Sequence, residues 1–159
     1  MTVYLALGTN LGDRYSHLQE ARTLIAGKIG SFSAISSIYE TEPWGFESEN
    51  KFLNQVVAVE TDLSPLEILD RTQEIERQIG RKEKTGHSYQ DRLIDIDLLL
   101  YGDTVLNTGK LQLPHPLLHK RKFVLEPLNE IAPDLVHPVL GQTSRQLYYW
   151  LCEKHFIFL

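Results

Sequence analysis

The chain contains almost no cysteine: Cys152 is the only one among its 159 residues. A single thiol excludes an internal disulfide framework and any zinc site built from several cysteines. Long apolar runs are absent too, because no stretch approaches the ~18 residues needed to span a bilayer. The first residues enter a strand pattern, TVYLALG, without the basic region of a signal peptide. We therefore expect one domain, residues 1–159, in the cytoplasm and away from membranes.

An excess of positive charge is also missing. The net charge is −5, which argues against general nucleic-acid binding. Between Arg77 and Lys122, however, nine Lys and Arg residues outnumber five Asp and Glu residues. A basic segment inside an acidic protein favours a small polyphosphate ligand, although a solvated charged loop has the same composition.

The periodicity of apolar residues predicts the order of the elements. Helical spacing follows Gly12 and Asp13, and a second helix begins with the capping pattern of Ser64, Pro65 and Glu67 and runs to Gly80. Alternation predicts strands over Thr2–Gly8, Ser33–Glu40, Phe52–Glu60 and Arg92–Tyr101. This β-α-β-β-α-β order is typical of an α+β, ferredoxin-like core, an antiparallel sheet with helices on one face. A C-terminal extension follows, with a short strand near Thr104–Asn107 and helices around Lys120–Ile131 and from about Thr143.

The most informative segment is RLIDIDLLLY, residues 92–101. In a strand, Asp95 and Asp97 share one face, whereas Ile94, Ile96, Leu98 and Leu100 form an apolar opposite face. Neighbouring carboxylates on a buried sheet repel each other unless a cation compensates them. Mg²⁺ prefers one or two carboxylates together with water and substrate phosphates. The alternative is an edge strand with both Asp side chains solvated, against which the many large aliphatic residues argue.

Basic residues near this segment suit phosphate binding. They are Arg81, Arg92, His115 between two prolines, and Arg121 within HKRK. Arginine binds phosphate in bidentate fashion and keeps its charge. Each of these residues taken alone is more often an ordinary surface residue, but beside the Asp pair they form a phosphate-handling set. A P-loop motif is absent, and the glycine-bearing segment from Gly8 to Arg14 is interpreted as a tight turn with a helix cap.

Two further pairs could bind the organic parts of a substrate. Phe52 and Asn54 share a strand face, where a ring and a carboxamide suit a flat heterocycle. The alternative is a core Phe with an Asn at the strand end. Gln73 and Glu76 lie along one side of a helix and could face a nucleotide or simply water.

Together these motifs resemble the 6-hydroxymethyl-7,8-dihydropterin pyrophosphokinase family of folate synthesis. The resemblance covers essentially the whole chain and is carried by GTNLGDR, ETEP, FLN, RLIDIDLLLYG, LPHP, RKFVL and EIAP, in that order. It implies the ferredoxin-like fold and transfer of diphosphate from ATP to a pterin alcohol. It also implies small-molecule substrates only and a monomer.

The resemblance further implies roles for particular residues. Asp95 and Asp97 would bridge two Mg²⁺ ions on the triphosphate of ATP, and Arg81 and Arg92 would be catalytic arginines. ATP would be bound by Gln73, Glu76, Arg92, His115 and Arg121. The pterin would be bound by Gly8, Thr41, Pro43, Trp44, Phe52, Asn54, Asp95 and Phe123.

One segment departs from the family pattern, and two other functions remain open. Tyr89-Gln90-Asp91 precedes Arg92 where the family often has Trp-Gly-Pro, so no role passes to Lys82, Lys84 or Tyr89. Another Mg-dependent nucleotide transferase would transfer the nucleotide and release pyrophosphate instead of AMP. A non-catalytic ferredoxin-like module would bind nucleotide without turnover.

Overall fold

The computed structural model describes residues 1–42, 50–80 and 93–157. Pro43, Trp44, Arg81 and Arg92 lie outside these ranges, as do residues 82–91. The core elements are β1 (Thr2–Thr9), α1 (Arg14–Lys28), β2 (Ser31–Ile35), β3 (Tyr39–Thr41), β4 (Phe52–Glu60), α2 (Pro65–Gly80) and β5 (Asp95–Tyr101). They are followed by β6 (Leu106–Asn107), β7 (Gln112–Leu113), the 3-10 helix η1 (Leu118–Lys120), α3 (Lys122–Ile131) and α4 (Ser144–Ile157).

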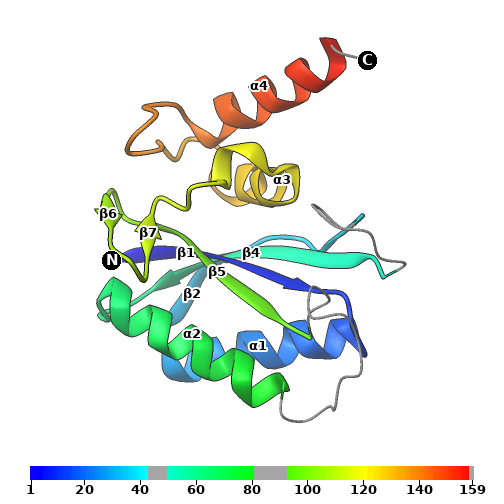
Figure 1. Cartoon of the computed structure of the whole chain (residues 1–159), viewed down its shortest axis with the longest axis vertical. Coiled ribbons are helices and arrows are strands. Elements are labelled where there is room, and N and C mark those ends of the chain that lie inside the picture. The colour runs from blue at the N-terminus through cyan, green and yellow to red at the C-terminus, as the bar shows by residue number, and fades with distance from the viewer. Residues whose placement is uncertain (43–49, 81–92, 158–159) are drawn as a thin grey trace.

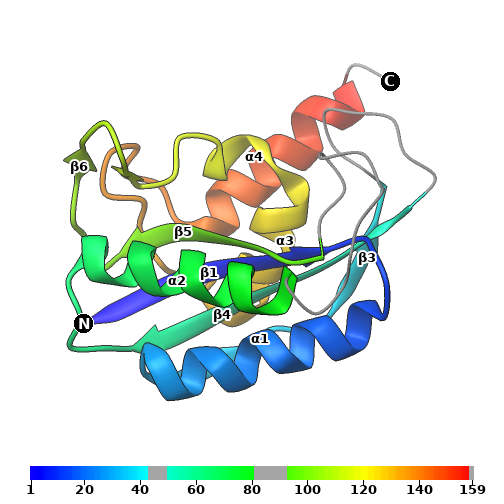
Figure 2. The same cartoon turned by 60° about the horizontal axis from the view of Figure 1, so that its bottom comes forward.

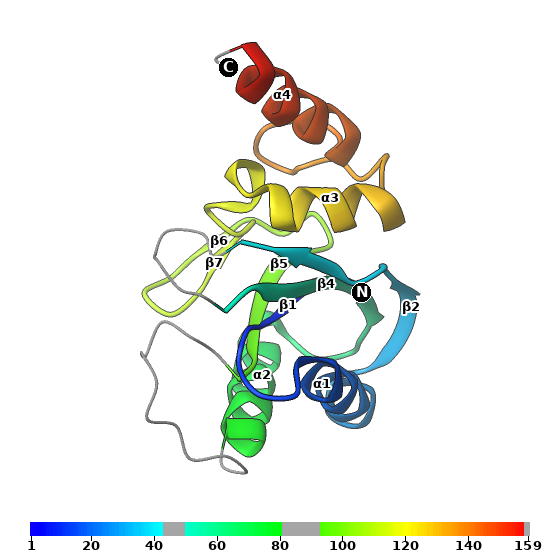
Figure 3. The same cartoon turned by 90° about the vertical axis from the view of Figure 1, so that its right-hand side faces the viewer.

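An antiparallel sheet with strand order β2-β4-β1-β5 forms the centre of the molecule, and β3 also pairs with β4. Helices α1 and α2 lie side by side across one face (Figures 1 and 2). Helix α3 packs on the opposite face and α4 packs outside α3, as Figure 3 shows. The predicted ferredoxin-like α+β core is confirmed, and its C-terminal extension covers the second face of the sheet.

The alternating strand pattern divides the core into two clusters. Leu5 and Leu7 of β1 point toward α1 and α2, where they pack with Leu18, Ile25, Ile68, Ile75 and Ile79. Val56 of β4 points the other way and packs with Leu118, Val124, Leu125, Leu128 and Leu147. Each fully buried aliphatic side chain contributes about 1.5–3 kcal/mol, so both layers are held to the sheet mainly by apolar burial.

Local hydrogen bonds start both core helices as the sequence predicts. The Asp13 side chain accepts a 3.2 Å bond from the Ser16 backbone N–H and caps α1, directly after Gly12 with φ 69°. Ser64 and Glu67 bond reciprocally, each backbone N–H donating to the other's side chain. The segment before α1 is therefore a tight turn with a helix cap, and α2 begins with a capping box.

The second predicted strand, Ser33–Glu40, is divided in two by Ser36. The Ser36 hydroxyl oxygen accepts a 2.9 Å hydrogen bond from the Val56 backbone N–H, in place of a backbone carbonyl. Strand β2 therefore ends at Ile35 and β3 begins at Tyr39, and both pair with β4.

Strand β5 differs from the prediction in two respects. It is an edge strand, a position that the sequence argued against. Its pairing with β1 also shifts, because Tyr4 pairs with Leu100 whereas Leu5 pairs with Leu98. The extra residue, Leu99, is a β-bulge, and Leu100 consequently packs with Leu99 on the α3 side. The prediction that Leu100 shares a face with Leu98 is wrong for this reason.

Candidate active site

Gly8 lies at the centre of a row of residues that crosses three strands. It pairs with Asn54 of β4 on one side and with Asp95 of β5 on the other. In the next row on the same face, Ala6 pairs with Val56 and Asp97. Directly opposite residues place their side chains on the same face of a sheet. Asn54, Asp95 and Asp97 therefore all lie on the face that α3 partly covers, and Gly8 leaves the space between Asn54 and Asp95 open.

The Asp pair is half-buried, and among the described residues its negative charge is only partly compensated by a basic side chain. Burial and the negative charge of Asp95 raise the pKa of Asp97 to about 7, although the charge of Arg121 opposes this shift. The Arg121 guanidinium Nη1 lies 3.9 Å from Asp97 Oδ2, which is too far for a hydrogen bond. The Asp97 side chain keeps 35% of its surface exposed, so a ligand can reach it.

Glu76 adds a third carboxylate to this region from helix α2. Its Oε2 accepts a 2.9 Å hydrogen bond from the Ile96 backbone N–H, a donor on the open edge of β5. Burial, the charges of Asp95 and Asp97 and a hydrogen bond with the Asp95 side chain together raise the pKa of Glu76 to about 8. The Ile96 hydrogen bond opposes this shift. Glu76 thus brings a third carboxyl group beside the Asp pair, and this group keeps its proton at neutral pH unless a bound cation stabilises its charged form.

His115, in the segment after β7, lies close enough to Asp95 and Arg121 to be affected by their charges. Its backbone N–H donates to the Leu99 carbonyl at 2.9 Å, which attaches this segment to β5. The His115 Nδ1 accepts a 3.1 Å bond from the Leu117 N–H, so the neutral ring carries its proton on Nε2. Burial and the charge of Arg121 lower the pKa of His115 against the influence of Asp95. At neutral pH His115 is therefore an uncharged hydrogen-bond donor.

Arg121 owes its place to a break in the predicted helix around Lys120–Ile131. The residue is extended, with φ −114° and ψ 109°, and separates η1 from α3. Its guanidinium carbon lies 5.5 Å from the centre of the Phe123 ring, in a cation–π contact. Arg121 therefore lies between a carboxylate, Asp97, and an aromatic ring, Phe123.

The residues predicted to bind a heterocycle come together at the other end of the Gly8 row. Asn54 is 5% exposed, and its amide donates to the Thr41 hydroxyl oxygen at 2.5 Å. Thr41 pairs with Phe52 across β3 and β4. A Cβ atom added to Gly8 would lie 3.5 Å from Asn54 Oδ1 and 3.7 Å from Phe52 Cδ1. Gly8, Thr41, Phe52 and Asn54, here called the sheet floor, thus form a continuous surface with an amide at its centre.

The roles of five other predicted site residues stay predictions. Gln73 is exposed on α2, and its proposed contact with ATP stays a prediction. Arg81, Arg92, Pro43 and Trp44 lie outside the described residues, so their assigned roles also stay predictions. Within the described ranges no group of three or more His, Cys, Asp or Glu side chains is arranged to hold a metal ion.

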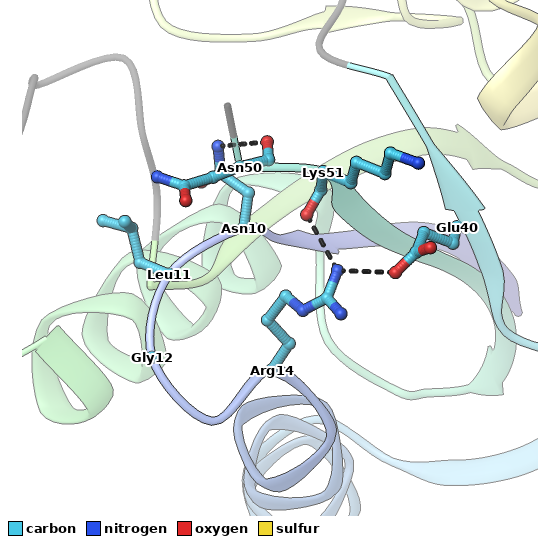
Figure 4. A pocket seen from close by; sticks show the side chains of 7 residues that line it. All are labelled: Asn10, Leu11, Gly12, Arg14, Glu40, Asn50 and Lys51. Carbon is cyan, nitrogen blue, oxygen red and sulfur yellow. Dashed lines mark hydrogen bonds and ion pairs between the residues drawn. The ribbon is translucent and has the colours of Figure 1, made fainter. Parts of the chain in front are cut away.

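A polar cavity that the sequence did not indicate opens at the ends of β1, β3 and β4. Its volume is about 440 Å³, and Figure 4 shows its lining residues, which are Asn10, Leu11, Gly12, Arg14, Glu40, Asn50 and Lys51. The Arg14 guanidinium bridges Glu40 and the Lys51 carbonyl oxygen. GTNLGDR suggested only a turn and a cap, because a contact between residues 37 positions apart leaves no local pattern.

Carboxylates beside an arginine and a neutral histidine, on the same sheet face as a buried amide, suit an enzyme that handles phosphate groups. The family model described as 7,8-dihydro-6-hydroxymethylpterin-pyrophosphokinase (HPPK) matches residues 4–133. The chain therefore belongs to the HPPK family.

Individual relatives agree with this assignment. A Porphyromonas gingivalis protein, 2-amino-4-hydroxy-6-hydroxymethyldihydropteridine pyrophosphokinase, is 49% identical over 138 residues, which are 86% of this chain and 93% of the relative. Folic acid synthesis protein FOL1 of Dictyostelium discoideum is 36% identical over 91% of this chain, which corresponds to 22% of that longer protein.

Solved structures show the same fold. The crystal structure of wild-type HPPK-DHPS from Plasmodium falciparum with SDX-DHP superposes with a TM-score of 0.75 at 18% identity. The match covers 96% of this chain and 44% of the Plasmodium chain. In the described part of this chain, no helix has the length and apolarity to cross a bilayer.

Proposed function

We propose that Asp95 and Asp97 bind two Mg²⁺ ions together with ATP, and that the sheet floor binds the pterin. As an HPPK-family pyrophosphokinase of folate synthesis, the protein transfers the β,γ-diphosphate of ATP to the hydroxymethyl oxygen of 6-hydroxymethyl-7,8-dihydropterin. AMP and the pterin diphosphate are the products. The observation that carries the residue assignment is the row Asn54–Gly8–Asp95, which puts the Asn54 amide and the Asp95 carboxylate on one face of the sheet.

The chemistry of the Asp pair fits a hard divalent cation. Burial and the neighbouring Asp95 charge raise the pKa of Asp97, and a bound cation would relieve both effects. Two carboxylates leave coordination positions for phosphate oxygens and water, as Mg²⁺ prefers. When bound, Mg²⁺ would neutralise the phosphate oxygens and hold the triphosphate in line with the attacking hydroxyl.

The floor residues would orient the pterin for attack. Asn54, nearly buried and fixed by Thr41, offers its amide oxygen toward the space above Gly8. Phe52 gives the ring a stacking surface at the start of β4, and Phe123 lies in the first turn of α3, the helix packed against that strand. Positioning of this kind supplies much of the rate in diphosphate transfer, because the chemistry itself needs little from the protein.

The basic side chains would stabilise the charge that moves during transfer. The hydroxymethyl oxygen forms a bond to the β-phosphorus, and the bond from that phosphorus to the oxygen bridging to the α-phosphate breaks. The bond's electrons stay on AMP, and the hydroxyl proton leaves to solvent. Arg121 would hold phosphate oxygens by charge, and His115 would donate its Nε2 proton as a neutral partner. Arg81 and Arg92 are assigned to the same task, and Gln73 and Glu76 to ATP.

We further propose that the protein works as a monomer in the cytoplasm. The sheet floor and the Asp pair lie on one face of one sheet, which supports this proposal. Light scattering on the purified protein measures its mass, and a stable dimer would contradict this part of the proposal.

Product analysis tests the function. The protein is incubated with ATP, Mg²⁺ and the reduced hydroxymethyl pterin, and products are separated by chromatography. AMP and a pterin diphosphate are expected in equal amounts, and turnover should stop when EDTA removes the metal. Pyrophosphate release with a nucleotide joined to the pterin would identify the rival nucleotide transferase. Binding of ATP without any product would identify a non-catalytic module.

A further inference from the structure

The turn between β1 and α1 is bonded to the chain just before β4. Asn10, which is 2% exposed, donates from its side-chain amide to the Asn50 carbonyl oxygen at 3.3 Å. Arg14, the first residue of α1, donates from Nη1 to the next carbonyl oxygen, that of Lys51, at 2.9 Å. Two consecutive backbone carbonyls are therefore fixed by side chains of one turn (Figure 4).

Arg14 reaches β3 as well. The same Nη1 lies 2.9 Å from Glu40 Oε2. Glu40 and Lys51 directly precede Thr41 and Phe52, which pair with each other and belong to the sheet floor. The Arg14 guanidinium thus contacts Glu40, which precedes Thr41 in β3, and Lys51, which precedes Phe52 at the start of β4.

Arg14 acts from outside the floor. Successive residues of a strand point to opposite faces, so Glu40 points away from the face that carries Thr41. The Lys51 ammonium lies 3.6 Å from Glu42 and does not compete for Glu40. Arg14 keeps 27% and Glu40 47% of their side-chain surface exposed, so solvent screens their ion pair. The bond to the Lys51 carbonyl is therefore the contact that fixes the backbone.

We propose that Arg14 is a positioning residue for pterin binding. By holding the Lys51 carbonyl, it fixes the backbone at the start of β4, where the Phe52 ring and the Thr41–Asn54 hydrogen bond define the floor. This inference rests on the proposed pterin site. Arg14 touches neither the Asp pair nor the phosphate-binding residues in the described part of the chain, so its effect is confined to the pterin.

Steady-state kinetics of Arg14→Ala test the proposal. The expected result is a KM for the pterin raised roughly 3- to 10-fold, the effect of losing one solvent-exposed hydrogen bond of ordinary strength. The KM for ATP and kcat should stay within twofold of the wild-type values. Glu40→Gln, which leaves the Lys51 contact intact, should change the pterin KM by less than twofold. Arg14→Lys, with one ammonium for two partners, should fall between the wild type and Arg14→Ala.

A matched control comes from the far end of the molecule. Arg145 forms a similar surface ion pair with Asp134 at 3.1 Å, beside α4. Arg145→Ala should leave all three kinetic constants unchanged. The proposal is overturned if Arg14→Ala behaves like Arg145→Ala, or if it shifts both KM values and kcat together with the melting temperature. If the wild-type protein makes no pterin diphosphate, the proposed function itself is wrong, and this result is distinct from any effect of the Arg14 variants.

Discussion

Glu76 Oε2 accepts a 2.9 Å hydrogen bond from the backbone N–H of Ile96, the residue between Asp95 and Asp97. This hydrogen bond ties helix α2 to the edge strand β5 and brings a third carboxyl group to the Asp pair. The electrostatic repulsion among these carboxyl groups depends on their protonation, because the pKa of Glu76 is raised to about 8 and that of Asp97 to about 7. Protonation and metal binding therefore relieve the same repulsion.

The metal-free protein should lose stability as pH rises from about 5 to about 8. In this window the unfolded state has released protons that folded Glu76 and Asp97 still hold, so the free energy of unfolding falls with pH. Glu76→Gln should raise stability at pH 8 by about 1–2 kcal/mol, or ~3–6 °C in melting temperature, and flatten the profile. Thermal unfolding in EDTA between pH 5 and pH 8 measures both the stability gain at pH 8 and the slope of the profile.

A control for this experiment is Glu74→Gln. Glu74 pairs with Lys28 at 2.6 Å, and that bond lowers its pKa. Removing the Glu74 carboxylate should leave the decline in stability between pH 5 and pH 8 as steep as in the wild type. A Glu76→Gln protein as pH-sensitive as the wild type would mean that the carboxylates do not share this repulsion.

Asp97→Ala should abolish turnover while sparing pterin binding. Asp97 lies one row away from Asn54, Gly8 and Asp95, so the sheet floor stays intact while one metal carboxylate is lost. We expect kcat to fall by at least about a thousandfold and the pterin affinity, measured by calorimetry, to change little. Wild-type activity of this variant in Mg²⁺ would show that the metal assignment is wrong. Asp134→Ala, near α4, serves as the control.

Gly8→Ala should weaken pterin binding without unfolding the protein. The added Cβ would make ordinary contacts with Asn54 and Phe52, at 3.5 Å and 3.7 Å, yet fill part of the floor. We expect the pterin KM to rise roughly tenfold, about the effect of one misplaced methyl group. Gly27→Ala, in α1 with no atom within 4 Å of the new Cβ, should add about 0.5–1 kcal/mol of stability and leave the KM unchanged.

Acid should destabilise the segment between α3 and α4. Burial lowers the pKa of both His119 and His137, whose rings meet edge to face at 6.3 Å. The His137 Nδ1 also accepts bonds from the Val139 and Leu140 N–H groups, which protonation would break. Because the unfolded state binds these protons first, stability should fall as pH drops below about 6.5.

His137→Asn tests this expectation, since its amide oxygen can accept the same turn bonds without titrating. Urea unfolding between pH 5 and 7.5 should show a smaller decline for the variant than for the wild type. If the stability of both proteins falls equally between pH 7.5 and pH 5, groups other than His137 cause the acid sensitivity.

Features encoded by neighbouring residues could be predicted from the sequence. Strand alternation separated Leu53 from Asn54 on β4, and the structure puts Leu53 in the core and Asn54 on the site face. The caps at Asp13 and Ser64 follow from side chains that bond within three residues.

Features that depend on distant contacts could not be predicted in this way. The bulge at Leu99 comes from the fit of β5 to β1, and the strand break at Ser36 comes from a bond to Val56. Glu76 joins the Asp pair only because α2 packs beside β5. Helical periodicity gives the side of α2 on which Glu76 lies but not what that side meets.

Anomalous diffraction from crystals grown with Mn²⁺ and a non-hydrolysable ATP analogue tests the central claim most directly. Our account predicts metal peaks within about 2.0–2.3 Å of carboxylate oxygens of both Asp95 and Asp97, with the analogue's phosphates completing the coordination. A structure with bound nucleotide in which both aspartates face solvent or form only salt bridges, without metal, would contradict it.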